Sequence, residues 1–397
     1  MNIGIVTTWM ERGAAYVSRT YMDLLAASGH NVVIFARGGE IIPDSANEKW
    51  NEYYVTRSSR YNDTTIEKRK IYKWIKNNSI DTILFNEQQD VRILIKIKKK
   101  FPQIKLGAYV DYYTERTLPW FDLYDFLICN TQRHMQAMAA HPQKYYLKWG
   151  TNMDVFKPSN IKHEQVTFFH SVGMSNRKGT DVLVDAYIKG KLYRDSKLII
   201  HTQIPINNVC KYSKDDLESY GIEIIEKTVT APGLYYLGDV YVYPTRLDGL
   251  GLTMYEALAS GMPMITSNFP PMNEVGDENC VRLVKIKDYY CRSDAYYFPM
   301  VICDEADLIE AMRWYIEHPE LLNMQKNCAR SYAEENYNIK NRAEELSDIV
   351  VNSQLREHST NLAKNILRYY KSTWNLRMII RHNRKILEIT KKLRKIK

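Results

Sequence analysis

Short apolar segments alternate with amphipathic segments along the first half of the chain. The apolar segments are rich in β-branched and aromatic residues and predict buried strands, and the segments between them have apolar residues at helical spacing. Strands are expected at 2–8, 31–37, 81–87, 104–110 and 121–130, and helices at 18–28, 65–77, 91–100 and 131–140. This alternation predicts a parallel sheet with helices on both faces, whose ligands bind at the carboxyl ends of the strands.

The same pattern restarts after a polar stretch at 157–165, which we take as a linker. Strands are expected at 166–173, 197–203, 240–245 and 264–268, with a helix at 181–190. The sequence therefore predicts two doubly wound α/β domains, at 1–157 and 158–350, followed by a helical tail at 351–397. A single large domain with insertions is the alternative.

Residues 247–263, LDGLGLTMYEALASGMP, lie where a predicted strand becomes a predicted helix. The first N–H groups of a helix have no partner within it, and the helix dipole makes that end attractive to an anion. Glycine lets a phosphate approach the backbone closely, because no Cβ intervenes. Asp248 and Glu256 would repel a phosphate, so their natural partners are hydroxyl groups. A phosphate flanked by hydroxyls describes a nucleotide sugar, whereas the simpler interpretation is a turn with a capping acid and a solvated glutamate.

The composition is that of a soluble globular protein: 397 residues, 45% apolar and 25% charged. No apolar run approaches the ~20 residues that span a bilayer, and no signal peptide is expected, so we expect a cytoplasmic protein. The cysteines are scattered, without metal-ligand spacing, and the chain has no D-x-D pair. We therefore expect a chemistry without a metal ion.

The net charge of +9 is concentrated in the C-terminal tail. From Leu355 to Lys397, seven lysines and six arginines stand against two glutamates, so the rest of the chain is slightly acidic. Apolar and basic residues alternate at helical spacing from Trp374 on, as in helices that lie on membranes. We expect the tail to hold the protein at the anionic inner face of the membrane; a tail that packs back on the N-terminal domain is the alternative. Nucleic-acid binding is not expected, because no second basic surface is visible in the sequence.

Four segments in this order resemble the retaining glycosyltransferases of family 4, which have the GT-B fold. Along the chain they are GTNMDVFKP at 150–158, SVGMSNRKGTDVLVDAY at 171–187, DGLGLTMYEALASGMP at 248–263 and SNFPPMNEV at 267–275. Asp248 takes the place of the more usual Glu, and Met174 takes the place of an Arg. The resemblance, over roughly residues 1–345, implies two Rossmann-like domains that face each other across a cleft.

The resemblance also implies roles for individual residues. Glu256 would accept hydrogen bonds from the ribose, and Asp248 would contact a hydroxyl of the donor sugar. Arg177 and Lys178 would neutralise the leaving diphosphate, although a solvated loop before a helix is the alternative for these two. The residues expected to bind the donor through their backbone are Gly13, Ala14, Gly249, Leu250, Gly251 and Leu252.

The acceptor site is expected in the N-terminal domain. Many family members have a His after the central strand of that domain, where this chain reads AYVDYYTER. Asp111 or Tyr112 would take its place, and Glu87, after the preceding strand, would lie within reach of the acceptor. His170, at the end of the strand at 166–173, is interpreted as a core histidine.

The implied reaction moves a hexose from a UDP- or GDP-linked sugar to a hydroxyl, with retention of the anomeric configuration and with no metal or cofactor beyond the nucleotide sugar itself. A lipid-linked or surface glycan would be the acceptor. The alternatives are a membrane-recruited nucleotide-sugar binder without activity and a sugar epimerase of the same fold. A nicotinamide-dependent oxidoreductase is disfavoured, because no G-x-G-x-x-G follows the first strand.

Overall fold

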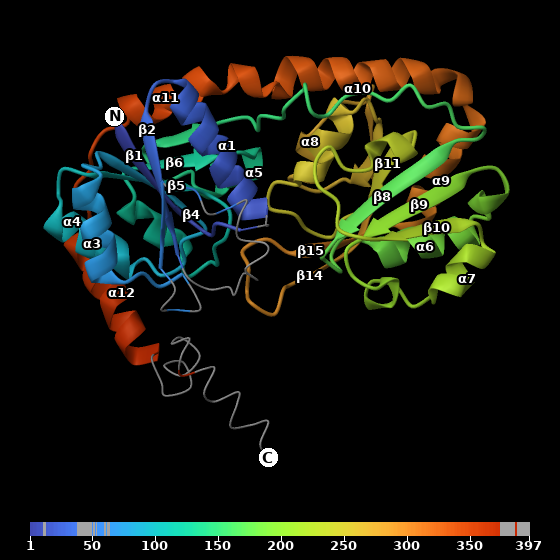
Figure 1. Ribbon diagram of the computed structural model, residues 1–397. Coiled ribbons are helices and arrows are strands. Elements are labelled where there is room, and N and C mark those ends of the chain that lie inside the picture. Colours follow the sequence, from blue (N-terminus) through green and yellow to red (C-terminus); the bar gives the residue numbers. More distant parts are fainter. Residues whose placement is uncertain are drawn as a thin grey trace. The chain divides into compact units, whose positions relative to one another are not determined.

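A computed structural model describes residues 1–10, 13–37, 50, 52, 54–58, 61, 64–373 and 386. The chain forms two compact units (Figure 1). The first unit comprises Met1–Asn130, His134–Leu147 and Arg342–Lys397, and the second comprises Thr131–Arg133 and Lys148–Asn341. The expected ranges were 1–157, 158–350 and 351–397, so the unit boundaries lie about ten residues earlier, at 147/148 and 341/342.

The first unit is built on a seven-stranded parallel sheet with the order β3-β2-β1-β4-β5-β6-β7. Its strands are β1 (Asn2–Thr7), β2 (Asn31–Ala36), β3 (Val55–Arg57), β4 (Thr82–Asn86), β5 (Lys105–Tyr109), β6 (Phe126–Cys129) and β7 (Lys144–Tyr146). The order reverses between β1 and β4, which is the switch point where doubly wound sheets bind ligands.

The helices associated with this sheet are α1 (Gly13–Ala27), α3 (Lys68–Asn77), α4 (Arg92–Lys100), α5 (Gln132–Ala137), α11 (Ala343–Asn352) and α12 (Thr360–Thr373). In α3 an apolar stripe is buried, with Ile71, Trp74 and Ile75 facing inward while the lysines point outward, whereas α11 packs on α1 and α12 packs on α4. Among the residues that the structure describes, no helix has the length and apolar character needed to cross a bilayer.

The second unit repeats the architecture with a six-stranded parallel sheet in the order β10-β9-β8-β11-β12-β13 and a small antiparallel pair, β14-β15. The strands are β8 (Thr167–Gly173), β9 (Lys197–Thr202), β10 (Ile222–Glu226), β11 (Val240–Tyr243), β12 (Met264–Ser267), β13 (Val281–Val284), β14 (Ile286–Tyr290) and β15 (Met300–Cys303). The helices are α6 (Thr180–Lys189), α7 (Lys214–Ser219), α8 (Leu252–Ala259), α9 (Glu305–Glu317) and α10 (Leu322–Tyr337).

The prediction of two doubly wound domains is therefore confirmed. Strands such as β4 and β11 are buried along their whole length, because helices cover both faces of a parallel sheet. The expected strand at 121–130 is too long. A 3-10 helix occupies Leu118–Leu123, and β6 begins only at Phe126. Leu123 is buried and the ring of Phe121 packs against Tyr113, so the apolar residues of this turn look like the start of a strand in the sequence.

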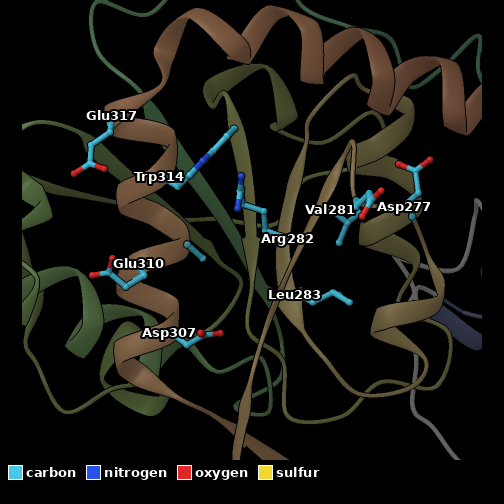
Figure 2. Close-up of a pocket in the computed structure, with 11 residues that line it drawn as sticks. Asp277, Val281, Arg282, Leu283, Asp307, Glu310, Trp314 and Glu317 are labelled. Atoms are coloured by element: carbon cyan, nitrogen blue, oxygen red, sulfur yellow. The ribbon is translucent and has the colours of Figure 1, made fainter.

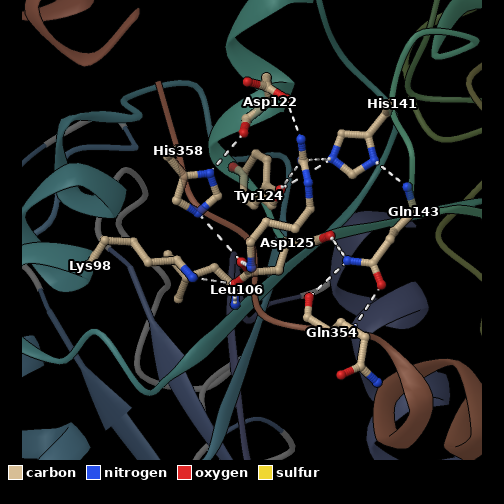
Figure 3. A network of polar contacts seen from close by, with 10 residues as sticks. Lys98, Leu106, Asp122, Tyr124, Asp125, His141, Gln143, Gln354 and His358 are labelled. Atoms are coloured by element: carbon tan, nitrogen blue, oxygen red, sulfur yellow. Dashed lines mark hydrogen bonds and ion pairs between the residues drawn. The ribbon is translucent and has the colours of Figure 1, made fainter. Parts of the chain in front are cut away.

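The last described segment of the chain completes the first unit through Asp125 (Figure 3). Its buried carboxylate accepts hydrogen bonds from the backbone N–H groups of Leu106 and Arg356, at 2.7 and 2.8 Å, and pairs with the Lys98 ammonium. The His358 ring lies 3.4 Å away. Burial by itself raises the pKa of Asp125, but the hydrogen bonds from His358, Lys98 and Leu106 lower it more, so the net pKa lies below the usual value.

Basic charge is not confined to the C-terminal tail, so the expectation that no second basic surface exists was wrong. The helices α3, α4 and α12 of the first unit contain lysines and arginines but no acidic residue. Counting charge along the chain hid this feature, because the acids that balance it lie elsewhere in the fold. The part of the tail at 374–397 lies, apart from Ile386, outside the described residues.

We predict that Asp125→Asn lowers the free energy of unfolding of the first unit by about 3 kcal/mol, because the Lys98 ammonium keeps its charge without a carboxylate partner. Denaturant titration at pH 7 measures this. The pKa of Asp125 is lower in the folded protein than in the unfolded chain, where an Asp has a pKa of about 3.9. The carboxylate therefore stabilises the fold fully above pH ~3.9, and this stabilisation is lost as the pH falls through the folded-state pKa. The gap between the two proteins should therefore close in acid.

Asp154→Asn is the matched control, because the pair of Asp154 with Lys340 is exposed on both sides and should contribute nothing measurable. Equal unfolding midpoints for Asp125→Asn and the wild type at pH 7 would contradict the anchoring role of Asp125.

Candidate nucleotide-sugar site

Two loops of the second unit lie together at its switch point, because they follow the neighbouring strands β8 and β11. The first loop leads into α6 through Gly179, and the second leads into α8 through Gly251. Both glycines have left-handed backbone conformations, with φ of 73° and 79°. The N-termini of two helices therefore start at the same edge of the sheet, which is where an anionic group is stabilised.

Gly179 brings the two loops into contact. A Cβ at this position would lie 2.0 Å from the carbonyl oxygen of Pro244, so no other residue fits. Beside it, the N–H of Arg246 donates to the carbonyl of Arg177 at 2.8 Å, and the Thr245 hydroxyl donates to the same oxygen at 3.2 Å. The predicted cations are therefore held on a loop whose backbone is fixed to the strand end that precedes Asp248.

Lys178, Tyr243 and Asp248 form one hydrogen-bonded cluster. The Lys178 ammonium lies 2.6 Å from Oδ2 of Asp248 and also donates to the Tyr243 hydroxyl, which itself donates to the same Oδ2. Burial raises the pKa of Asp248, but the charge of Lys178 and the two hydrogen bonds lower it more, so the net pKa is below the usual value. Burial and the neighbouring Asp248 raise the pKa of Tyr243 well above its usual value. The cluster therefore contains a carboxylate, an ammonium group and a neutral phenol.

Glu256 lies on α8, at a position that is half-buried. Its Oε2 accepts a hydrogen bond of 2.6 Å from the Tyr235 hydroxyl. Burial raises the pKa of Glu256, and the hydrogen bond from Tyr235 offsets part of this increase. Among the described residues, no hydrogen bond reaches the second oxygen, Oε1, so that oxygen has capacity to accept one.

Arg177 directly precedes Lys178 on the same loop, and its charge is a smaller contribution to the lowered pKa of Asp248. The guanidinium Nε donates to the Ser175 hydroxyl at 3.3 Å, and the side chain is half-buried rather than solvated. The predicted group of Asp248, Glu256, Arg177 and Lys178 thus belongs to one edge of one sheet. Gly249, Leu250, Gly251 and Leu252 form the backbone between Asp248 and α8.

Arg133 supports this loop, and sequence analysis did not identify it. It is 3% exposed, and its guanidinium donates to the backbone carbonyls of Asp248, Gly249 and Pro270, the last at 2.9 Å. Its backbone N–H donates to Glu274 at 3.0 Å, and the ring of Phe298 lies 4.5 Å from the guanidinium carbon. An arginine within a helical pattern gives no signal of such a role, because its partners are carbonyl groups that are distant in the sequence.

The residues predicted in the first unit follow adjacent strands. Gly13 begins α1, after β1, and Asn86 at the end of β4 donates to the carbonyl of Ala14 at 2.8 Å. Glu87 follows β4 with a left-handed φ of 52°, and its carbonyl accepts a hydrogen bond from Arg37. Asp111 and Tyr112 follow β5, the neighbour of β4, and both are half-buried. These residues therefore share the carboxyl edge of the first sheet, and their roles stay predictions.

His170 is a core histidine. It is fully buried, its Nδ1 lies 2.7 Å from the carbonyl of Val242, and its Nε2 lies 2.9 Å from the Thr180 hydroxyl. Burial lowers its pKa to about 4, so the ring is neutral at physiological pH. It ties β8, β11 and the start of α6 together.

A cavity of about 580 Å³ in the second unit does not suit the proposed donor (Figure 2). It lies between β13 and α9, and its lining includes the acids Asp277, Glu278, Asp307, Glu310 and Glu317. The guanidinium of Arg282 is stacked 3.4 Å from the centre of the Trp314 ring. A lining with five carboxyl groups and one arginine repels a diphosphate, so this cavity is a poor fit for a nucleotide sugar.

We predict that Gly179→Ala lowers the free energy of unfolding by about 2 kcal/mol more than Gly221→Ala does. Gly221 has a similar φ of 69°, but a Cβ added there would meet nothing within 4 Å. Both substitutions therefore carry the left-handed backbone penalty, and only Gly179→Ala adds the clash with Pro244. Denaturant unfolding of the two variants measures the difference. Equal losses would mean that the two loops do not depend on this contact.

Comparison with known proteins finds a similarity to one family over part of the chain. Residues 164–291 match the family model of the glycosyl transferases group 1. Over 129 residues, 32% of the chain, it is 28% identical to the O-antigen biosynthesis glycosyltransferase WclY of Escherichia coli, and this match spans about a third (35%) of that curated relative.

Two solved structures share the fold over most of the chain. The sucrose-phosphate synthase of Thermosynechococcus elongatus is 15% identical with a TM-score of 0.68, over 88% of this chain and 98% of that one. HepE from Anabaena, in complex with UDP and glucose, is 12% identical with a TM-score of 0.66 and the same coverage. Residues 164–291 are therefore similar to the group 1 glycosyltransferases, and the chain as a whole has the two Rossmann-like domains of the GT-B fold.

Proposed function

We propose that the protein is a retaining, metal-independent glycosyltransferase that moves a hexose from a UDP- or GDP-linked sugar to a hydroxyl of a lipid-linked or surface glycan. The observation that carries this proposal is the cluster of Lys178, Tyr243 and Asp248 at an edge where two helices begin. The name of the E. coli relative, an O-antigen biosynthesis glycosyltransferase, and the UDP and glucose bound to the Anabaena protein favour a nucleotide-sugar donor.

The diphosphate is bound by positive charge from several sources. The N–H groups at the start of α8 face the phosphates, Lys178 supplies an ammonium group, and Arg177 supplies a guanidinium. Lys178 pairs with Asp248 in this structure, so the bound diphosphate shares the ammonium with that carboxylate. The free lone pairs of Asp248 accept a hydroxyl of the sugar, and Oε1 of Glu256 accepts a ribose hydroxyl.

Catalysis depends on charge that grows during bond breaking. As the C1–O bond to the diphosphate breaks, negative charge accumulates on the leaving phosphate oxygen, and the fixed cations stabilise it more than they stabilise the bound donor. The acceptor hydroxyl attacks C1 from the same face, its proton passes to the leaving phosphate, and the new C1–O bond keeps the anomeric configuration. No protein nucleophile takes part in this scheme.

Arg133 positions the loop rather than contacting the donor. Its guanidinium fixes the carbonyls of Asp248 and Gly249, so their N–H groups and the Asp248 side chain keep one orientation. A preorganised site does not have to reorganise when charge develops, and this lowers the barrier. The residues of the first unit, Gly13, Ala14, Glu87, Asp111 and Tyr112, are proposed to complete the donor and acceptor sites.

Replacing either acid should abolish transfer. We expect Glu256→Ala and Asp248→Ala each to lower kcat/KM by about 100- to 1,000-fold, because a lost buried hydrogen bond to a hydroxyl is not compensated by the other acid. Transfer is measured with UDP- and GDP-sugars and a glycan acceptor, and donor binding is measured by thermal shift with the same nucleotides.

Glu310→Ala, in the acidic cavity between β13 and α9, is the control and should keep wild-type turnover. A folded Glu256→Ala variant with wild-type kcat/KM would refute the site assignment. Conversion of the donor sugar without an acceptor would identify an epimerase, and nucleotide-sugar binding without any product would identify a binder.

The positive side chains should replace a metal ion. Activity is expected to persist in excess EDTA, and Lys178→Ala should lose at least about 100-fold in kcat, because the leaving diphosphate loses its ammonium partner. Lys191→Ala is the comparison, since Lys191 is an exposed lysine of the same unit outside the cluster. Strict dependence on added Mg²⁺ or Mn²⁺ would overturn metal independence.

A further inference from the structure

The helices α3, α4 and α12 of the first unit form a continuous basic surface, hereafter the basic face. Its exposed cations are Lys68, Arg69, Lys70, Lys73 and Lys76 on α3, Lys96, Lys99 and Lys100 on α4, and Lys364, Arg368 and Lys371 on α12. None of these three helices contains Asp or Glu. Among the described residues, none of these cations has an ion pair with a carboxylate.

The helix α4 is in direct contact with both α3 and α12, so the charges of the three helices act together (Figure 1). The Tyr72 hydroxyl of α3 donates to the carbonyl of Lys96 on α4 at 2.7 Å. Arg92 of α4 lies 4.4 Å from the ring of Tyr370 on α12. Burial lowers the pKa of Lys96, and the charges of Arg92 and Lys68 lower it further. Lys68 lies on α3 and Lys96 on α4, so cations of neighbouring helices repel one another.

Asp90, which lies just before α4, pairs with Arg92 and offsets part of this repulsion, but the three helices themselves contain no acid. Like charges on adjacent helices destabilise a protein that has no anionic partner. Only Ile366 of α12 is fully buried, and aromatic contacts of Trp120 with Tyr369 and Tyr370, at 5.4 and 5.7 Å, hold that helix. An anionic surface opposite the face would convert the repulsion into attraction.

The basic face also includes an apolar hollow. A cavity of about 600 Å³ lies between α4 and the start of α12, and it is lined by residues of the first unit alone. Its apolar lining consists of Leu94, Ile95, Pro102, Leu123, Leu355 and Ala363, and its rim carries Lys98, Lys99, Arg356, His358 and one acid, Glu357. Leu355 is 48% exposed, and Leu367 on α12 is 42% exposed.

We propose that the basic face docks on a bilayer of anionic lipids, with the apolar hollow and Leu367 receiving part of a lipid. Each exposed cation near an anionic leaflet gains attraction, so the cations of the three helices contribute together. A polyanion such as a nucleic acid or acidic glycan would also be attracted by the cations, but it gains nothing from exposed leucines or an apolar hollow. A bilayer satisfies both features. This docking is compatible with the proposed lipid-linked acceptor but does not depend on it.

The experiment uses the full chain and sedimentation with vesicles of phosphatidylglycerol and phosphatidylcholine, or of phosphatidylcholine alone. The wild type should sediment only with the anionic vesicles. Replacement of Lys68, Arg69, Lys70, Lys73 and Lys96 by Gln should weaken partitioning at least ~10-fold, because five cations are removed from the face. These side chains are exposed, so the fold should persist, and circular dichroism checks this.

A matched control replaces five exposed lysines of the second unit by Gln, at Lys157, Lys162, Lys191, Lys227 and Lys287. It has the same net charge as the first variant and should bind as the wild type does. The double variant Leu355→Gln/Leu367→Gln should bind as the wild type does in low salt. When salt is added, it should leave the vesicles at a lower salt concentration than the wild type, because it lacks the apolar contribution that salt does not screen.

Three outcomes would overturn the proposal: equal binding by the face variant and the control, equal binding of the wild type to neutral vesicles, or binding to duplex DNA with no binding to anionic vesicles. If the face variant bound anionic vesicles as well as the control variant does, any membrane contact would have to come from the residues after Thr373. Transfer to a soluble acceptor, measured in parallel, separates a failure of docking from a failure of the proposed function, because the face contains none of the residues proposed to bind the donor.

Discussion

The candidate site depends on one close approach between two loops. With hydrogen in place of a side chain, Gly179 lets the carbonyl of Pro244 lie where a Cβ would otherwise be. This contact brings the end of β11 against the start of α6, so Lys178 reaches a carboxylate that is 70 residues away in the chain. The ionised Asp248, the neutral Tyr243 and the N-terminus of α8 all take their positions from this arrangement. Without it, the same residues would be separate polar groups on a sheet edge.

Patterns that are local in sequence predicted local structure correctly. The strand, glycine loop and helix at 240–261 follow from β-branched residues, glycines and helical spacing, and Gly261 has the expected left-handed φ of 71° just after α8. The alternation of strands and helices was sufficient for the doubly wound fold, because each unit of strand, helix and strand has one preferred handedness.

Contacts between distant segments could not be predicted in this way. Tyr243 and Tyr235 look like ordinary apolar residues of a strand and a turn, but their hydroxyls are partners of Asp248 and Glu256. Arg133 binds carbonyls more than a hundred positions away, which no side-chain pattern encodes. The basic face was missed for a related reason. Its cations are spread over α3, α4 and α12, and acids elsewhere in the chain, many of them in the first unit itself, balance them in a count along the sequence.

The first unit is discontinuous in sequence, and this has a consequence for its synthesis. The backbone N–H that Arg356 donates to Asp125 comes from a residue 231 positions later, and Lys105 binds the carbonyls at the end of α11. On the ribosome, the second unit is complete before the segment that finishes the first has been made. The nascent first unit then holds a buried carboxylate without its later partners, so the N-terminal segment cannot reach its final stability until the residues from Arg342 on have been made. The second unit would therefore be completed before the first, although the strands of the first unit are synthesised earlier. The helices α11 and α12 would be the last elements to join the first unit.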